Sequence, residues 1–193
     1  RKLEGNYIEV GLNKNVINIF DLQPVSTDAD EKESEEVMYD TKIAIKNVVE
    51  DMIIMFKTLW PNITEDEINV LDEITEKTYR VVGIDGTESF RYLKPEDYPT
   101  FTTFSVVIDQ MLEEYENSSL KNKKVIEALL NLQMKMRSLV GTAGIEGHLS
   151  RYFNGTTNIN MDSLDTIGLV SFGTKHLMNT PEHIRNALLR IIF

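Results

Sequence analysis

RYFNGTTNIN, residues 151–160, separates a long helix-forming stretch from the apolar, strand-like segment IGLVSF. Asn154 and Gly155 both tolerate a positive φ angle, so this dipeptide predicts a tight turn. Tyr152 and Phe153 can anchor that turn against a core. We therefore predict that the chain passes here from helices into a strand, and that a β-branched residue in place of Gly155 destabilises the protein.

Four amphipathic helices are predicted on the N-terminal side of this turn. Apolar residues recur there at intervals of three and four, which places them on one face of a helix. Pro61 ends the first helix, and Thr64 with Glu67 forms a capping box that starts the second. A stretch with two glycines and two prolines, from 83 to 101, predicts a long connection. The helices are expected at residues 36–60, 64–82, 102–115 and 120–140.

Strand character appears at both ends of the chain. Alternating apolar residues predict two short strands, at 7–10 and 16–20, ahead of an acidic loop at 24–36. A further strand is predicted within 165–173, followed by a last helix that begins at Thr180 and Pro181.

This order of elements predicts a predominantly α protein with a few β-strands. We expect an all-helical module, residues 36–150, inserted between two short pieces of an α/β layer. The first piece, residues 1–35, holds the strand pair and the acidic loop. The second, residues 151–193, holds the turn, a strand and a helix.

Charge argues against a general nucleic-acid surface, because the net charge is −11. Between residues 118 and 140, however, basic side chains outnumber acidic ones by five to one. Lysines on a helix face can neutralise phosphates without reading sequence, whereas an ordinary solvated helix face would show the same pattern. The residues of this candidate nucleic-acid or partner surface, called the basic set below, are Lys121, Lys123, Lys124, Lys135 and Arg137.

No catalytic, cofactor-binding or metal-binding residue is predicted. The chain has no cysteine and no Gly-x-x-x-x-Gly-Lys-Ser/Thr loop. GTAGIEG, residues 141–147, follows a helix and predicts a helix cap and turn. The three histidines lack the i, i+4 spacing of a zinc site. No apolar run in the sequence reaches the roughly 20 residues that are needed to cross a bilayer.

Four segments, in the same order along the chain, resemble the CagE/TrbE/VirB ATPases, the large motors of conjugative transfer and type IV secretion. The last segment is the most specific, although Thr156 stands where the family usually has proline and Asn160 where it usually has aspartate. We predict a structural role for the turn in this segment. The four segments are NVINIFDLQP (15–24), ITEDEINVLDEITEKTYR (63–80), PTFTTFSVVIDQM (99–111) and GHLSRYFNGTTNIN (147–160). The matching turn residues are Phe153, Asn154, Gly155, Thr157, Asn158 and Ile159.

The resemblance implies a RecA-like motor domain that carries a helical insertion. In the family, the phosphate-binding loop lies upstream of the position of Arg1 and the magnesium-binding acidic strand lies downstream of Phe193. The chain is therefore expected to be a piece of a longer ATPase, to hold no cofactor itself, and to be inactive alone. ATP and magnesium are expected only in the parent protein, and no catalytic residue of the family falls on this sequence.

For the parent, the resemblance implies a bacterial motor, associated with mobile elements, that powers translocation of DNA or protein. We expect it to be a homo-oligomer in the cytoplasm, at the inner face of the membrane, in contact with proteins of the secretion machinery and weakly with DNA. The other function left open is a stand-alone helical module that binds nucleic acid or protein through the basic set.

Overall fold

The computed structural model describes residues 5–9, 16–26, 37–118, 122–159, 169–173 and 175–192. Its architecture is predominantly helical with three two-stranded sheets, so the predicted fold class is confirmed. None of the helices in these residues is both long and apolar enough to cross a lipid bilayer.

The first helix, α1 (Thr41–Leu59), starts later than its apolar periodicity predicts. Asp40 caps it, because the side chain accepts the backbone N–H groups of Lys42 and Ile43. Of the residues expected to be helical from 36 onward, the described residues 37–39 are not: Val37–Met38 forms β3, which pairs antiparallel with β2 (Val25–Ser26). Most of the predicted acidic loop at 24–36, namely residues 27–36, lies outside the described residues.

The next three helices follow the predictions closely. α2 (Glu65–Val81) begins with the predicted capping box, in which the N–H of Glu67 donates to Thr64 Oγ1 and the N–H of Thr64 donates to Glu67 Oε2 at 2.8 Å. α3 (Phe101–Asn117) and α4 (Lys123–Leu139) follow. The long connection between α2 and α3 contains two short 3-10 helices, Phe90–Tyr92 and Pro95–Asp97.

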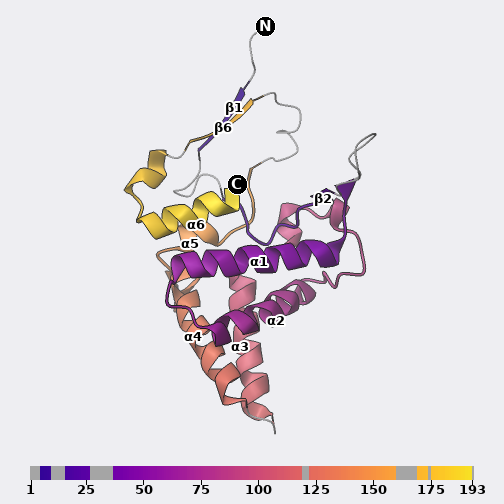
Figure 1. The fold of residues 1–193 in the computed structure, drawn as a ribbon, viewed down its shortest axis with the longest axis vertical. Helices are drawn as coiled ribbons and strands as arrows, with labels where there is room; N and C mark the ends of the chain where they lie inside the picture. The colour runs from indigo at the N-terminus through magenta and orange to yellow at the C-terminus, as the bar shows by residue number, and fades with distance from the viewer. Residues whose placement is uncertain are drawn as a thin grey trace.

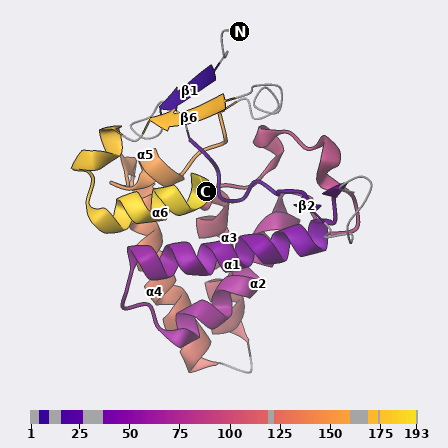
Figure 2. The ribbon, with the colours of Figure 1, turned by 45° about the horizontal axis from the view of Figure 1, so that its top comes forward.

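Helices α2, α3 and α4 pack on one another, and α1 lies across them (Figure 1). On the other side of α1 lies α6 (Glu182–Ile192), the helix predicted after Thr180 and Pro181 (Figure 2). The aromatic centre of the core joins α1, α3 and the segment around residue 20, with ring centroids 5.2 to 6.4 Å apart. Its fully buried members are Phe20, Phe56, Phe101 and Phe104. Phe20 belongs to no helix, so an irregular segment supplies a central core residue.

Only one of the two predicted N-terminal strands is present. β1 (Gly5–Glu9) pairs in parallel with β6 (Leu169–Gly173), and the two lie at the top of Figures 1 and 2, beyond α6. The prediction of a second strand at 16–20 is wrong. That segment forms a turn, in which the N–H of Asp21 donates to the carbonyl of Asn18, and backbone groups of Val16 and Asn18 bond to a remote loop at 157–158.

The segment after α4 contains a tight hairpin and a short helix. β4 (Gly141–Thr142) and β5 (Ile145–Glu146) pair antiparallel, and Gly141 has φ +103°, which confirms the predicted helix cap and turn. α5 (Ser150–Phe153) then leads into the turn, and a 3-10 helix (Lys175–Asn179) precedes α6.

Candidate functional site

Two irregular segments far apart in the sequence meet at the centre of the molecule. The N–H of Val16 donates to Asn158 Oδ1 at 2.8 Å, and the N–H of Asn158 donates back to the carbonyl of Val16 at 3.2 Å. The buried N–H of Asn18 donates to Thr157 Oγ1 at 2.7 Å across 139 positions of sequence. Residues 16–23 and 154–159, called the junction below, are thus bound together directly.

Three of the surrounding elements hold the junction in place. The side-chain amide of Asn18 donates to the carbonyl of Pro99 at 2.8 Å, and the buried hydroxyl of Tyr79, on α2, donates to the carbonyl of Phe20 at 2.6 Å. Asn154 Oδ1 accepts the N–H of Thr102 at 3.1 Å. Because the first N–H groups of a helix have no partner within it, Asn154 satisfies the start of α3 from outside. The junction therefore fixes how α2 and α3 meet.

The chain bends at Asn154 and Gly155, but without the positive φ angles on which the predicted tight turn relied. Asn154 has φ −105° and ψ 98°, and among the described residues positive φ occurs elsewhere, for example at Gly141 and Gly144. A Cβ atom on Gly155 would meet Val16 Cγ1 at 3.6 Å, an ordinary contact, so the predicted strain from a side chain there loses its basis. The loop is shaped by bonds to other segments, which local sequence cannot show. The other turn residue singled out from sequence, Phe153, is buried.

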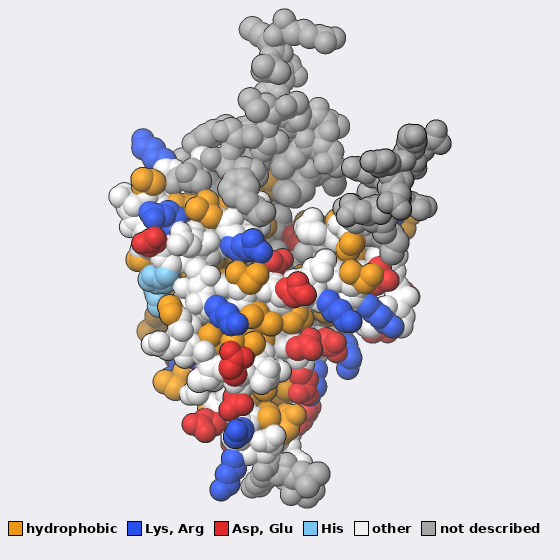
Figure 3. Space-filling model, in the orientation of Figure 1, with side chains coloured by type: hydrophobic (Ala, Val, Ile, Leu, Met, Phe, Trp, Pro, Cys, Tyr) orange, Lys and Arg blue, Asp and Glu red, His pale blue; other side chains and the backbone are white. Residues whose placement is uncertain are grey.

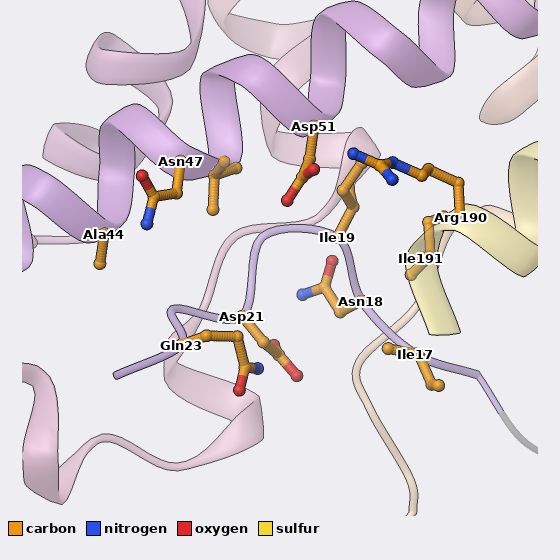
Figure 4. A pocket seen from close by; sticks show the side chains of 11 residues that line it. Ile17, Asn18, Ile19, Asp21, Gln23, Ala44, Asn47, Asp51, Arg190 and Ile191 are labelled. Carbon is orange, nitrogen blue, oxygen red and sulfur yellow. The ribbon is translucent and has the colours of Figure 1, made fainter. Parts of the chain in front are cut away.

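A cavity of about 100 Å³ opens between the junction, α1 and α6 (Figure 4). In Figure 4, Asp51 and Arg190 lie on one side of the view, Asp21 and Gln23 lie on the other, and Asn18 lies between them. Apolar side chains complete the wall, and these are Ile17, Ile19, Ala44, Val48 and Ile191. The cavity therefore combines an apolar wall with two carboxyl groups and several amides.

Asp21 is the most strongly perturbed acid of this cavity. Burial raises its pKa from 3.8 to about 6, although hydrogen bonds from Thr157 and Asn18 act in the opposite direction. Its Oδ1 is buried and has no hydrogen-bond partner among the described protein atoms. Asp21 in turn contributes, after burial, to raising the pKa of Tyr98 to about 12.

Asp51, across the cavity, also has a raised pKa, and burial is again the main cause. The charge of Arg190 acts in the opposite direction and lowers it. The two carboxyl groups thus differ in their surroundings, because a cation faces Asp51 while hydrogen-bonding side chains face Asp21.

Sequence reasoning did not identify Asp21 as part of a site. The available indication was an acid placed directly between two apolar residues, Phe20 and Leu22, both of which are buried. A carboxyl group in such a run is a candidate for a perturbed pKa.

The basic set does not form one surface. Lys121 lies outside the described residues, and the side chain of Lys135 forms an ion pair with Glu67, which is 1% exposed. Lys124 and Lys135 are separated by about 16 Å along α4, at 1.5 Å per residue. Lys123 and Arg137 lie near the two ends of α4 and are exposed. The set is therefore spread along the helix, and one member is engaged inside the molecule.

The bond to Lys135 has a structural consequence for α2. Burial raises the pKa of Glu67, but hydrogen bonds from Lys135 and Thr64 outweigh burial and hold it below its usual value. The same carboxylate caps α2, so the ion pair links the start of α2 to α4. On the face drawn in Figure 3, lysine and arginine side chains are interspersed with aspartate and glutamate.

The described residues bring together no group of three or more histidine or acidic side chains that could hold a metal ion. The site consists of a junction that positions helices and of a small polar cavity beside it.

The fold defines a class of protein: a helical module with a parallel strand pair beyond α6 and an irregular junction at its centre. Among solved structures it is similar to VirB4 of Thermoanaerobacter pseudethanolicus, with a TM-score of 0.72 and 17% sequence identity. The match covers 100% of this chain and 60% of that one. No family model and no curated protein matches the sequence. The resemblance to VirB-type ATPases stated from sequence is thus confirmed at the level of the fold.

Proposed function

We propose that this chain is a central portion of the motor domain of a VirB4-type ATPase, of the kind that powers type IV secretion or conjugative transfer. The observation that carries the proposal is the agreement of fold with VirB4 over the whole length of the chain. The chain corresponds to 60% of the matched protein, which leaves room for nucleotide-binding segments elsewhere in a longer polypeptide.

The positions of the family-like segments support this proposal. Two of the four, residues 15–24 and 147–160, contribute the two sides of the junction, where they bond to each other directly. The other two contain Tyr79 and Thr102, which hold the junction from α2 and α3. Residues that resemble one family in sequence therefore cooperate in one structural unit.

Within such a motor the chain acts as a structural and interaction segment. ATP and magnesium bind to other parts of the parent, and the parent assembles with the secretion machinery at the inner face of the membrane. Contacts with partner proteins fall to the exposed faces of the helical module, while the junction fixes the helices relative to β1 and β6.

The direct test compares the chain with the polypeptide that contains it. Purified alone, the chain is expected to show no ATP hydrolysis above background and no change in melting temperature with Mg-ATP. The longer polypeptide is expected to contain a Gly-Lys-Ser/Thr loop before this segment and an Asp-Glu strand after it, and to hydrolyse ATP. Tight Mg-ATP binding and turnover by the chain alone would contradict the proposal.

The alternative, a stand-alone module that binds nucleic acid through the basic set, has less support, because Lys135 is paired with Glu67 and the other cations are spread along α4. A titration of single- and double-stranded DNA at several salt concentrations tests it. Binding that weakens with salt and is abolished by Lys123→Glu, Lys124→Glu and Arg137→Glu together would favour the alternative.

A further inference from the structure

The cavity beside the junction has the composition of a site for a positively charged group. It is lined by two carboxyl groups, Asp21 and Asp51, and by the side-chain amides of Asn47 and Gln23. Arg190 is the single cation among its lining residues. Acidic groups therefore outnumber basic ones, and an anionic ligand would face two carboxylates.

The two ends of the cavity are not equivalent. Arg190 lies near Asp51 in Figure 4 and lowers its pKa, so that carboxylate already has a cation beside it. Asp21 lies at the other side of the view and also lines the cavity, and the side chains that hydrogen-bond to it, Thr157 and Asn18, are uncharged. A charged donor placed against Asp21 would form the shorter, stronger type of hydrogen bond that a carboxylate makes with a cation.

We propose that the Asp21 end of this cavity binds a guanidinium or primary ammonium group carried on a short aliphatic stem. This inference does not depend on the motor function proposed above.

The size and the apolar wall of the cavity suit a small cation on a short aliphatic stem. A volume of about 100 Å³ has room for a small cationic head and a few methylene groups but not for a nucleotide. Ile17, Ile19 and Val48 line the cavity and offer an apolar wall to a methylene stem, as stems of lysine and arginine commonly pack on apolar surface. A metal ion is less suitable, because the described acids and histidines do not gather in groups of three.

The test is a titration of the 193-residue chain with butylguanidinium and with butylammonium, followed by two-dimensional ¹H–¹⁵N NMR at constant ionic strength. Butylurea is the matched neutral control, because it has nearly the shape of butylguanidinium without its charge. We expect saturable shifts, in the millimolar range, at the backbone amides of residues 17–23 and the side-chain amide of Asn47. Butylurea is expected to cause none of these shifts.

Variants identify the acceptor. Asp21→Asn, which keeps the shape and removes the charge, is expected to weaken binding by roughly tenfold or more. Asp51→Asn is expected to weaken it less, and Asp72→Asn, at an exposed position on α2, not at all. The mapped shifts on the unmodified chain test the site even where a variant fails to fold.

The source of the cation is decided by a second pair of ligands, agmatine and the peptide acetyl-Gly-Arg-Gly-amide. Tighter binding of agmatine indicates a free amine, and tighter binding of the peptide indicates an arginine of a partner protein; both support a cation site. The proposal is overturned if butylguanidinium causes no saturable shift at the cavity, if butylurea binds equally well, or if Asp21→Asn binds as the unmodified chain does. Each of these results would show that the charge of Asp21 does not hold a cation in this cavity.

Discussion

At the scale of single residues, Asp21 is held in a position that disfavours its own charge. Burial raises its pKa from 3.8 to about 6, so the folded protein binds a proton at this site more tightly than the unfolded chain does. Between about pH 4 and pH 6 the native state therefore holds more protons, and the contribution of Asp21 to the free energy of unfolding falls as the pH rises through this window.

Replacing Asp21 by asparagine should stabilise the protein at about pH 7.5 and have no effect below about pH 4. A shift of about two pH units corresponds to about 3 kcal/mol. The pKa of about 6 already includes the opposing hydrogen bonds from Thr157 and Asn18, so we expect a gain of up to about 3 kcal/mol. Urea denaturation of both proteins across this pH range measures the difference, with Asp72→Asn as the control. A gain that is independent of pH would contradict the electrostatic explanation.

Thr157 should be indispensable to the junction through its hydroxyl group. Thr157→Val preserves the shape of the side chain but leaves the buried N–H of Asn18 without its acceptor at 2.7 Å. A buried donor left without a partner costs about 1–3 kcal/mol. Thermal unfolding should show a loss in this range for Thr157→Val and almost none for Thr156→Val, since Thr156 is exposed. Equal melting temperatures for the two variants would mean that the loop is held by other contacts.

At the scale of elements, the Lys135–Glu67 ion pair joins α4 to the first turn of α2. Lys135→Met should leave the carboxylate of Glu67, 1% exposed, with the cap of α2 as its remaining support. Loss of one partner from a largely buried pair is strongly destabilising, and we expect about 2 kcal/mol, because the Lys135 side chain is 19% exposed. Lys124→Met, at an exposed position on the same helix, is the matched control. Similar denaturant midpoints for the two variants would show that the pair contributes little.

The elements whose signals are local were predicted well from sequence. The capping box at Thr64 and Glu67 lies within four residues, and the apolar spacing of α2, α3 and α4 reports directly which face is buried. Residues 16–20 were misassigned because an alternation of apolar residues is consistent with a strand, while their real partners lie about 140 positions away. The candidate site likewise depends on long-range contacts, since Asp21, Thr157 and Asn158 acquire their roles only when the junction forms.

At the scale of the whole molecule, the helices and the strand pair β1–β6 differ in how much packing stabilises them. The helices share one continuous core, which includes Phe20 from the junction and Leu188 from α6. The strands β1 and β6 form a parallel pair of five residues each. Parallel sheets occur almost entirely inside larger α/β layers with both faces covered, and two strands alone are only marginally stable. This contrast is expected if β1 and β6 belong to a wider sheet of a motor domain.

Hydrogen exchange of the chain distinguishes these two parts. Amides of residues 5–9 and 169–173 should exchange at least roughly 100-fold faster than those of buried α2 and α3 residues such as Ile74 and Ile108, because a two-strand sheet can open without unfolding the helices. Within a longer motor polypeptide, added strands would pair with β1 or β6, and exchange in these two strands should slow toward the rate of the helical core. Equal protection of strands and helices in the chain alone would show that the sheet is complete as a pair, and would remove this support for a larger parallel sheet.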